Sequence, residues 1–452
     1  MLSNLKKKAI IILMTYHIVT YGCQMNVHDS EKIAGVLKAR GYSETDDPKN
    51  SDVVIFNTCC IRESAEARAL GAIASFKGVK ARRPDTVLIV VGCVPQKEDS
   101  FEKLQRDFKF VDIVLGTHNL TDFEKTFDEY SASKNRFTEI IPKALNLKEN
   151  ASYRTSGANA WVNIMYGCNN FCTYCIVPYV RGRERSRAPE EIIDEVTACV
   201  ADGYREITLL GQNVNSYGVG LDVNINFAAL LRKICEIPGD YRIKFMTSNP
   251  KDLTDGVIDC IAENRKLADY IHLPAQSGST KILAAMNRRY TRESYLTLIG
   301  KIREKIPHCG LSSDFIAGFP GETDGDFQDT LSMVREVRFN NIYSFMFSRR
   351  RGTVAATLPD AIESAVKKQR VRELIALQRE ISSSIALECA GKSYRALIER
   401  EHGDMREGNP VALSDCGKMI FLEPTDEKYL HTFQNVFVTG NRSGRLVGRV
   451  GE

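Results

Sequence analysis

The chain has 452 residues, enough for about two to four domains, and its hydrophobic and charged fractions of 43% and 26% are those of an ordinary globular protein. A net charge of +4 excludes a polycation that binds nucleic acid through overall charge, so any such binding must depend on local patches. The thirteen cysteines are spread along a long chain, which argues against a secreted disulfide framework and favours a reducing cytoplasm.

Residues 1–14 combine three lysines with a short apolar run. The run is too short to span a bilayer, and no small-residue cleavage site follows it. We interpret these residues as an N-terminal extension that precedes the first strand, with a wrongly assigned start codon as the alternative.

Three apolar runs in the first hundred residues each end in a cysteine. The runs "YHIVTYGC", "SDVVIFNTC" and "TVLIVVGC" end at Cys23, Cys59 and Cys93, here called the N-terminal trio. They are short and rich in Val and Ile, as buried strands are, and helix-like stretches separate them. Strands joined by crossover helices run parallel, and ligands collect beyond their carboxyl ends. We therefore predict a parallel, flavodoxin-like α/β domain over residues 15–130, whose trio binds an iron–sulfur cluster.

Other cysteines in the chain are not predicted to be ligands. Cys60 adjoins Cys59 but would point to the opposite face if the strand continued. The stretch 29–41 is predicted to be a helix, capped by Asp29 or Ser30. The remaining cysteines show no ligand spacing and are interpreted as packing residues: Cys199, Cys235, Cys260, Cys309, Cys389 and Cys416.

A second cluster of cysteines follows a predicted linker over residues 131–158. The strand-like "AWVNIMYG" leads into "CNNFCTYC", which contains Cys168, Cys172 and Cys175, here called the loop trio. A structural zinc site needs four ligands, and no fourth cysteine or histidine lies within reach of this loop. A [4Fe–4S] cluster bound by three cysteines keeps one iron open to chelate a small molecule. The spacing therefore predicts a catalytic cluster, with three buried thiols as the plainer alternative.

Five more strand-like runs follow, separated by helical stretches: "REITLLGQ", "YRIKFMTS", "DYIHLPAQ", "LSSDFIAGFP" and "NIYSFMFSR". Six alternating units over residues 159–383 indicate a partial (βα)6 barrel with its functional face at the carboxyl ends of the strands. Small and amide residues at those ends predict a pocket for a nucleoside and an amino-acid group, although each alone could belong to an ordinary turn: Gly211, Gln212, Ser248 and Gln276. Short strands with turn signals over residues 384–452 predict a small C-terminal β-barrel.

Several strings resemble those of a known enzyme family. The loop "CNNFCTYC" is similar to the CxxxCxxC loop of radical S-adenosylmethionine (SAM) enzymes, and the first domain resembles the N-terminal domain of methylthiotransferases. Longer strings resemble one branch, the tRNA-2-methylthio-N6-dimethylallyladenosine synthases (the MiaB family): "YGCQMNVHDSE", "NTCCIRESA", "YCIVPYVRGRERSR", "LLGQNVNSYG", "MNRRYTRE" and "GFPGET". The resemblance covers nearly the whole chain from about residue 15.

The resemblance implies a mechanism with two [4Fe–4S] clusters and SAM as cofactors. The cluster on the loop trio would chelate SAM and cleave it reductively, and the resulting 5'-deoxyadenosyl radical would abstract hydrogen from C2 of the modified adenosine beside the anticodon. The cluster on the N-terminal trio would supply the sulfur, and a second SAM the methyl group. The C–H bond at C2 of the adenosine is not acidic, so no side-chain base suffices and the cofactors carry the chemistry. Tyr174 is implied to lie near the cofactor's adenine, with a packing role as its equal alternative.

The same resemblance implies the partners. They are the anticodon loop of tRNA and an electron donor such as flavodoxin or ferredoxin, with no membrane partner and a monomer as the default. Two arginine runs near the predicted active face are expected to contact phosphates, although such runs are usually only solvated: Arg181, Arg183, Arg185 and Arg187, and Arg349, Arg350 and Arg351. The C-terminal barrel resembles the RNA-binding TRAM domain.

The charge of the C-terminal barrel limits that expectation. From residue 385 on, nine Lys or Arg stand against ten Asp or Glu. RNA contact there would therefore depend on a few residues such as Arg442, Arg445 and Arg449.

Two alternatives stay open. The same chemistry could act on N6-threonylcarbamoyladenosine in tRNA or on a ribosomal-protein aspartate. The protein could instead be a non-catalytic iron–sulfur protein that binds RNA or carries electrons. Electron carriers usually complete all four cysteine ligands of each cluster, whereas each site here offers three, which favours catalysis.

Overall fold

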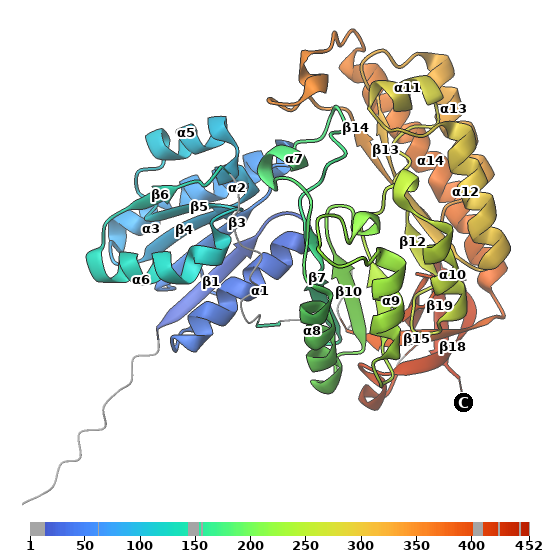
Figure 1. The fold of residues 1–452 in the computed structure, drawn as a ribbon, viewed down its shortest axis with the longest axis horizontal. Helices are drawn as coiled ribbons and strands as arrows, with labels where there is room; N and C mark the ends of the chain where they lie inside the picture. The colour runs from blue at the N-terminus through green and yellow to red at the C-terminus, as the bar shows by residue number, and fades with distance from the viewer. Residues whose placement is uncertain are drawn as a thin grey trace, which may run out of the picture. The chain divides into compact units, whose positions relative to one another are not determined.

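The structure, a computed structural model, describes residues 14–61, 63–142, 153–154, 157–400, 410–423, 425–442 and 444–451. The chain divides into two compact units (Figure 1). The first comprises Met1–Thr155 with Tyr179–Arg181, and the second comprises Ser156–Pro178 with Gly182–Glu452. The extension predicted over residues 1–14 lies, except for Met14, outside the described residues.

The first unit is built on a parallel six-stranded sheet in the order β2-β1-β3-β4-β5-β6. Strands β3, β4 and β5 are buried along their whole length, which is why their sequences are continuous apolar runs. The order 2-1-3-4-5 is that of the flavodoxin-like fold, so the predicted fold class is confirmed. The strands are β1 Thr15–Thr20, β2 Ser43–Glu44, β3 Val53–Thr58, β4 Val87–Gly92, β5 Ile113–Gly116 and β6 Phe137–Glu139. Strand β6 falls within residues that the sequence analysis assigned to a linker.

The helices of this unit cross over between the strands: α1 Gln24–Ala39, α2 Glu63–Ser75, α3 Lys77–Arg82, α4 Cys93–Gln96, α5 Glu98–Asp107 and α6 Phe123–Ser133. The start predicted for the first helix, near residue 29, is wrong. Helix α1 begins at Gln24 because the carbonyl of Cys23 already accepts from the N–H groups of Asn26 and Val27. Asp29 and Ser30 are buried inside the helix and do not cap it.

The second unit opens with six parallel strands: β7 Asn159–Asn163, β10 Glu206–Leu210, β11 Arg242–Phe245, β12 Tyr270–His272, β13 Gly310–Ala317 and β14 Asn341–Met346. They form two sheets, β7-β10-β11 and β12-β13-β14. An isolated parallel bridge between Ile243 and Leu267 continues the pairing from β11 toward β12. The predicted partial barrel of six units is confirmed.

The helices of the barrel pack side by side, α8 with α9, α9 with α10, α10 with α12, and α13 with α14 (Figure 1). Helices α12 and α13 each begin with a capping box, on Thr291 and Thr323. The helices are α7 Val177–Val180, α8 Pro189–Ala201, α9 Phe227–Glu236, α10 Asp255–Glu263, α11 Thr280–Ala285, α12 Arg292–Lys305, α13 Asp324–Val337 and α14 Ser364–Cys389. A hairpin, β8 Met165–Tyr166 with β9 Arg185–Ser186, flanks the loop trio.

Five strands close a small barrel at the C-terminus in the order β15-β16-β17-β19-β18, as predicted. They are β15 Ser393–Glu399, β16 Val411–Ser414, β17 Met419–Leu422, β18 Phe433–Arg442 and β19 Arg445–Val450. Helix α14 packs Leu374 into the core of the larger barrel and Cys389 into that of the smaller one. The boundary predicted between residues 383 and 384 therefore falls inside one continuous helix.

Short 3₁₀ helices complete the described part of the chain: Leu120–Asp122, Val214–Ser216, Pro250–Asp252, Val354–Thr357 and Glu427–Tyr429. Within the described ranges, none of the helices has the length and apolar character that a membrane span requires.

Candidate functional site

The structure brings the N-terminal trio together at one edge of the first sheet. Cys23 is the N-cap of α1, Cys59 follows the end of β3, and Cys93 is the first residue of α4. The strands β1, β3 and β4 that precede them are neighbours, and the Cys93 thiol acts electrostatically on both Cys23 and Cys59. Gly22 and Gly92 permit this approach: at φ +129° and +102°, a Cβ on Gly22 would lie 2.6 Å from Cβ of Cys59, and one on Gly92 would lie 2.4 Å from a backbone oxygen.

The thiols of the N-terminal trio are buried, and their pKa values shift in different directions. Burial raises the pKa of Cys23 above its ordinary value and that of Cys59 to about 12. The pKa of Cys93 is lowered to about 6, mainly by a hydrogen bond with the Cys60 thiol. Burial opposes this shift, and the positive charge of the nearby Arg181 adds to it. The expectation that Cys60 points away required the strand to continue, and that condition is not met. Strand β3 ends at Thr58, so the alternation of a strand no longer applies at residue 60.

A buried polar network surrounds the N-terminal trio. The Asn26 amide donates to Oδ1 of Asn57 at 2.9 Å and to the carbonyl of Thr58 at 3.0 Å. Arg181, which belongs to the first unit, places Nη2 2.9 Å from Oδ2 of Asp29 and 3.4 Å from Oδ1 of Asn26. The side chains of Asn26, Asn57, Asp29 and Arg181 are all buried.

The loop trio lies between the strands of the β8–β9 hairpin. Gly167, at φ +76°, donates its N–H to Oε1 of Gln212, and a Cβ on it would lie 2.0 Å from the carbonyl oxygen of Arg183. The N–H of Cys168 donates to the carbonyl of Gly182 at 3.1 Å. The Asn170 amide lies 3.4 Å from Sγ of Cys168. The turn that presents the first cysteine is thus fixed on both sides.

Residues 286–288, just after α11, hold the same loop from another direction. Thr173 donates its N–H to the carbonyl of Met286 at 3.1 Å, and the Asn287 amide donates to the carbonyls of Phe171 and Asn170. Arg288 reaches Sγ of Cys172 with Nη1 at 3.4 Å. The string "MNRRYTRE" carries part of the family resemblance, but no role for it was predicted. Nothing in the spacing of these residues indicates that they contact a loop over a hundred positions earlier.

The two trios offer donors that fit iron–sulfur clusters. All six cysteines are free, and burial raises the pKa of Cys168 above its ordinary value and that of Cys175 to about 12. Within the described ranges, no three His, Cys, Asp or Glu side chains converge on a point where one metal ion could bind. A [4Fe–4S] cluster places each thiolate on a different iron, so it does not require such convergence.

The predicted cofactor residues occupy the carboxyl ends of the barrel strands. Gly211 and Gln212 follow β10, and Gln276 follows β12 at φ +70°, hydrogen-bonded to β13 through its backbone. Ser248 follows β11 and is buried, and its hydroxyl has no hydrogen-bond partner among the described residues. An unpaired buried hydroxyl is costly, so Ser248 fits a site that a polar ligand completes.

Tyr174 and Gln212 have structural partners. Tyr174 packs against a small apolar cluster that contains Ile282, Met286 and Phe347. The side-chain oxygen of Gln212 is already bonded to the cysteine loop.

The prediction that the whole first arginine run contacts phosphates is wrong. Arg181 and Arg187 are buried, because Arg181 pairs with Asp29 and Arg187 pairs with Glu195 at 2.7 Å. Arg183 is exposed and lies over the ring of Phe171. In the second run, Arg349 and Arg351 are exposed, and Arg349 donates to the carbonyls of residues 356 and 358.

The three arginines expected to contact RNA on the small barrel, Arg442, Arg445 and Arg449, are all exposed. Arg442 and Arg445 are paired across the β18–β19 hairpin, and Arg445 lies over the ring of Phe421. These positions leave the guanidinium groups accessible to a phosphate.

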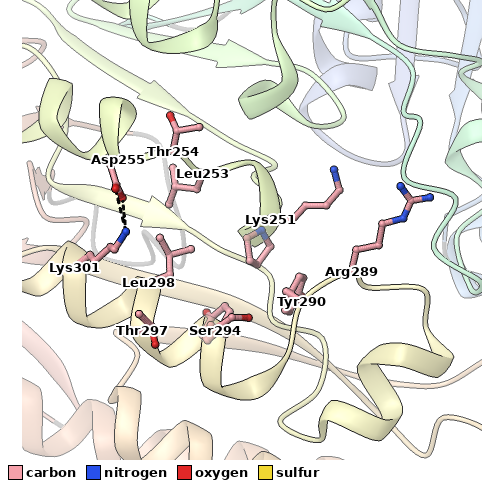
Figure 2. A pocket seen from close by; sticks show the side chains of 12 residues that line it. Lys251, Leu253, Thr254, Asp255, Arg289, Tyr290, Ser294, Thr297, Leu298 and Lys301 are labelled. Carbon is pink, nitrogen blue, oxygen red and sulfur yellow. Dashed lines mark hydrogen bonds and ion pairs between the residues drawn. The ribbon is translucent and has the colours of Figure 1, made fainter.

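A pocket of about 510 Å³ lies outside the cysteine loop, between residues 250–255 and 289–301 (Figure 2). Lys301 and Asp255 form an ion pair across it at 2.9 Å, and Lys251 pairs with Asp252 at 2.6 Å. Tyr290 lines the pocket and also accepts a hydrogen bond from Nε of Arg288. This pocket was not predicted from the sequence.

A partial (βα)6 barrel with three cysteines in the loop after its first strand defines the class of radical SAM enzymes. Residues 162–334 match the radical SAM superfamily, and residues 15–116 match an uncharacterized protein family, UPF0004. One solved structure with a similar fold is TsrM from Kitasatospora setae, a radical S-adenosylmethionine methyltransferase with cobalamin and a [4Fe-4S] cluster bound. The TM-score is 0.55 at 13% identity, over 76% of this chain and 74% of that one.

Curated relatives extend the match over nearly the whole chain. A protein of Thermoanaerobacter pseudethanolicus is 47% identical over 97% of this chain and 93% of its own length. A protein of Clostridium botulinum strain Langeland is 48% identical over 98% of both chains. Both are named tRNA-2-methylthio-N(6)-dimethylallyladenosine synthase. The chain belongs to this family, and the resemblance found in its sequence is confirmed.

Proposed function

We propose that the protein is a radical SAM methylthiotransferase that adds a methylthio group to C2 of N6-dimethylallyladenosine next to the anticodon of tRNA. The observation that carries this conclusion is the pair of three-thiol sites, one at the carboxyl edge of the first parallel sheet and one in the β8–β9 hairpin loop, in a chain that matches enzymes of that name over almost its whole length. A site with three thiolates leaves one iron open, which suits catalysis better than electron storage.

The cofactors are two [4Fe–4S] clusters and SAM. When bound, they supply the reductive cleavage of SAM, the radical chemistry at carbon and the sulfur for transfer. The N-terminal trio would hold one cluster and the loop trio the other. Around SAM we place Tyr174, Gly211, Gln212, Ser248 and Gln276.

The chain's own residues orient and enclose these groups. Gln212 and Asn287 fix the backbone of the cysteine loop, so that its thiols keep one arrangement. Arg288 places a buried positive charge 3.4 Å from Sγ of Cys172, where it would offset the negative charge of a cluster bound to the loop trio. The Ser248 hydroxyl would give its hydrogen bond to the polar part of the cofactor.

The proposed contacts with RNA phosphates are the exposed Arg183, Arg349 and Arg351 and the partly buried Arg350 beside the barrel, and the exposed Arg442, Arg445 and Arg449 on the C-terminal barrel. Residues 15–130, 159–383 and 384–452 would act as the methylthiotransferase, radical SAM and TRAM-like domains. We further propose a cytoplasmic monomer that receives electrons from a small carrier such as flavodoxin or ferredoxin.

Mass spectrometry of tRNA nucleosides tests the proposal. Cells that lack the protein should lose the methylthio group from N6-dimethylallyladenosine and regain it when the gene is restored. A variant with Cys168, Cys172 and Cys175 replaced by Ala should not restore it. Persistence of the product, with loss of a methylthio group from N6-threonylcarbamoyladenosine or from a ribosomal-protein aspartate, would overturn the substrate assignment.

A further inference from the structure

Arg181 is the buried cation of the N-terminal trio. Its side chain is 6% exposed, and it is fixed by an ion pair of 2.9 Å with Asp29, which is 2% exposed. Oδ1 of Asn26, 3.4 Å from its Nη2, lies 3.5 Å from Sγ of Cys23, and the charge of Arg181 acts on both Cys93 and Cys23. Its segment is anchored in the first unit, where the hydroxyl of Thr117 donates to the carbonyl of Val180.

The ion pair with Asp29 does not make the arginine inert. A buried guanidinium is tolerated only with partners, and Asp29 with Asn26 occupies one edge of the fork through Nη2. The guanidinium carries five N–H donors, and Asp29 and Asn26 are contacted through Nη2, so its charge still acts on Cys93 and Cys23. Asp29 and Asn26 therefore fix the position of the Arg181 guanidinium without cancelling its effect on the thiols.

A fixed cation here has a definite electrostatic consequence. Three thiolates and a cluster bring negative charge into a site where burial already disfavours ionised thiols. Reduction of a cluster adds one more negative charge, so a nearby positive charge stabilises the reduced form and a nearby carboxylate destabilises it. Hydrogen bonds to the ligating sulfurs act in the same direction as the positive charge, and all three are recognised determinants of cluster potential.

We propose that Arg181 is the positioning residue that sets the reduction potential of the cluster on the N-terminal trio, with Asp29 holding its guanidinium toward the thiols. This inference rests on the proposed function of the trio. Arg181 follows Cys175 by only six residues, so one short segment of the chain supplies the last ligand of one cluster and the charge of the other.

The test measures potential instead of turnover. A background variant with Cys168, Cys172 and Cys175 replaced by Ala can retain only the cluster of the N-terminal trio. After anaerobic reconstitution, its midpoint potential is measured by a dithionite titration followed by EPR, and its iron content is determined in parallel.

Three substitutions in this background separate charge from shape. Arg181→Gln should shift the midpoint to a more negative potential, and Arg181→Lys should restore most of the shift. Asp29→Asn keeps an oxygen acceptor for Nη2 but removes the opposing charge, so it should shift the midpoint to a more positive potential. A purely structural role cannot produce shifts of opposite sign from the two halves of one ion pair.

The matched control is Arg183→Gln, which makes the same charge change two residues away on an exposed side chain. It should leave the midpoint unchanged. An Arg181→Gln variant with a normal iron content and an unchanged midpoint potential would overturn the role of Arg181 and leave the proposed N-terminal cluster standing. A background variant that binds no iron would instead defeat the proposed N-terminal cluster itself. If Arg181→Gln fails to fold, the shift in Asp29→Asn still decides the question.

Discussion

Arg288 directs Nη1 at Sγ of Cys172 across 3.4 Å, and both side chains are buried. The rest of its guanidinium is held by the barrel wall, with Nη2 2.9 Å from the carbonyl of Pro274 and Nε 2.9 Å from the hydroxyl of Tyr290. The cation therefore cannot turn away from the cysteine loop. Each of the two thiol trios thus has one buried arginine beside it, Arg288 in the second unit and Arg181 in the first.

Replacing Arg288 with Ala should lower the iron content of the loop trio and destabilise the second unit by about 2–3 kcal/mol, since it removes a charge-assisted hydrogen bond and leaves buried acceptors unpaired. Iron analysis and thermal unfolding of reconstituted protein measure both effects. Arg289→Ala is the control, because Arg289 is exposed and does not reach the loop. Equal iron in the two variants would show that Arg288 does not support the cluster.

Gly167→Ala should be far more damaging than its size suggests. The residue sits at φ +76°, and a Cβ would meet the carbonyl oxygen of Arg183 at 2.0 Å, so the turn before Cys168 must open. Gly220→Ala is the matched control at φ +84°, where a Cβ meets nothing within 4 Å. It should cost only the backbone strain of about 1–2 kcal/mol. Melting temperature and iron per chain distinguish them, and similar losses in both variants would contradict the steric explanation.

The sequence predicted those features that depend on local pattern. Continuous apolar runs ending in cysteine identified β1, β3 and β4 and the edge where Cys23, Cys59 and Cys93 meet, because crossover helices force neighbouring strands to be parallel. The cysteine loop was found from spacing alone.

Long-range contacts could not be predicted in the same way. Arg181 looked like one of four equivalent arginines, and only the folded chain pairs it with Asp29, 152 positions earlier. Arg288 meets a loop 116 positions away, which no periodicity records. The start of α1 was missed because Cys23 caps it through its backbone, without the polar side chain that usually marks such a position.

Acid should weaken the junction between the two barrels of the second unit. There Arg242, fully buried, bridges Glu206 at 2.5 Å and Asp415 of the small barrel at 2.9 Å. Burial opposes ionisation of Glu206, but Lys244 and Arg242 outweigh it and lower its pKa from 4.5 to about 2. Because the folded pKa lies below the unfolded value, the contribution is full above about pH 4.5 and is lost as pH falls toward 2.

The ionised Glu206 contributes on the order of 3 kcal/mol to the free energy of unfolding. Thermal unfolding between pH 7 and 3 should therefore show a steep loss that Glu206→Gln, already destabilised at neutral pH, no longer shows. Asp255→Asn, which breaks the exposed pair with Lys301, should keep the wild-type profile. A wild-type pH profile in Glu206→Gln would rule this junction out as the acid-sensitive element.

Arg351→Ser should weaken tRNA binding and flatten its dependence on salt. Each lost phosphate contact reduces the slope of log K against log salt by about 0.7–0.9. The triple replacement of Arg349, Arg350 and Arg351 should reduce the slope further, although Arg349 also supports the backbone of its own loop. Filter binding at several salt concentrations measures the slopes. An unchanged slope in the folded triple variant would exclude this run from the RNA interface.

Ser248→Ala should separate ligand binding from stability. The buried hydroxyl has no protein partner among the described residues, so its removal deletes an unpaired polar group and should leave the melting temperature unchanged or slightly higher. If the hydroxyl bonds to SAM, its loss should weaken SAM binding about tenfold, which corresponds to about 1.4 kcal/mol. Ser216→Ala is the opposite case, because that hydroxyl already donates to the carbonyl of Asn213 at 2.9 Å. It should lower stability and leave SAM affinity unchanged. Equilibrium binding of SAM to the reconstituted protein decides between the two patterns, and unaltered affinity in Ser248→Ala would remove Ser248 from the cofactor site.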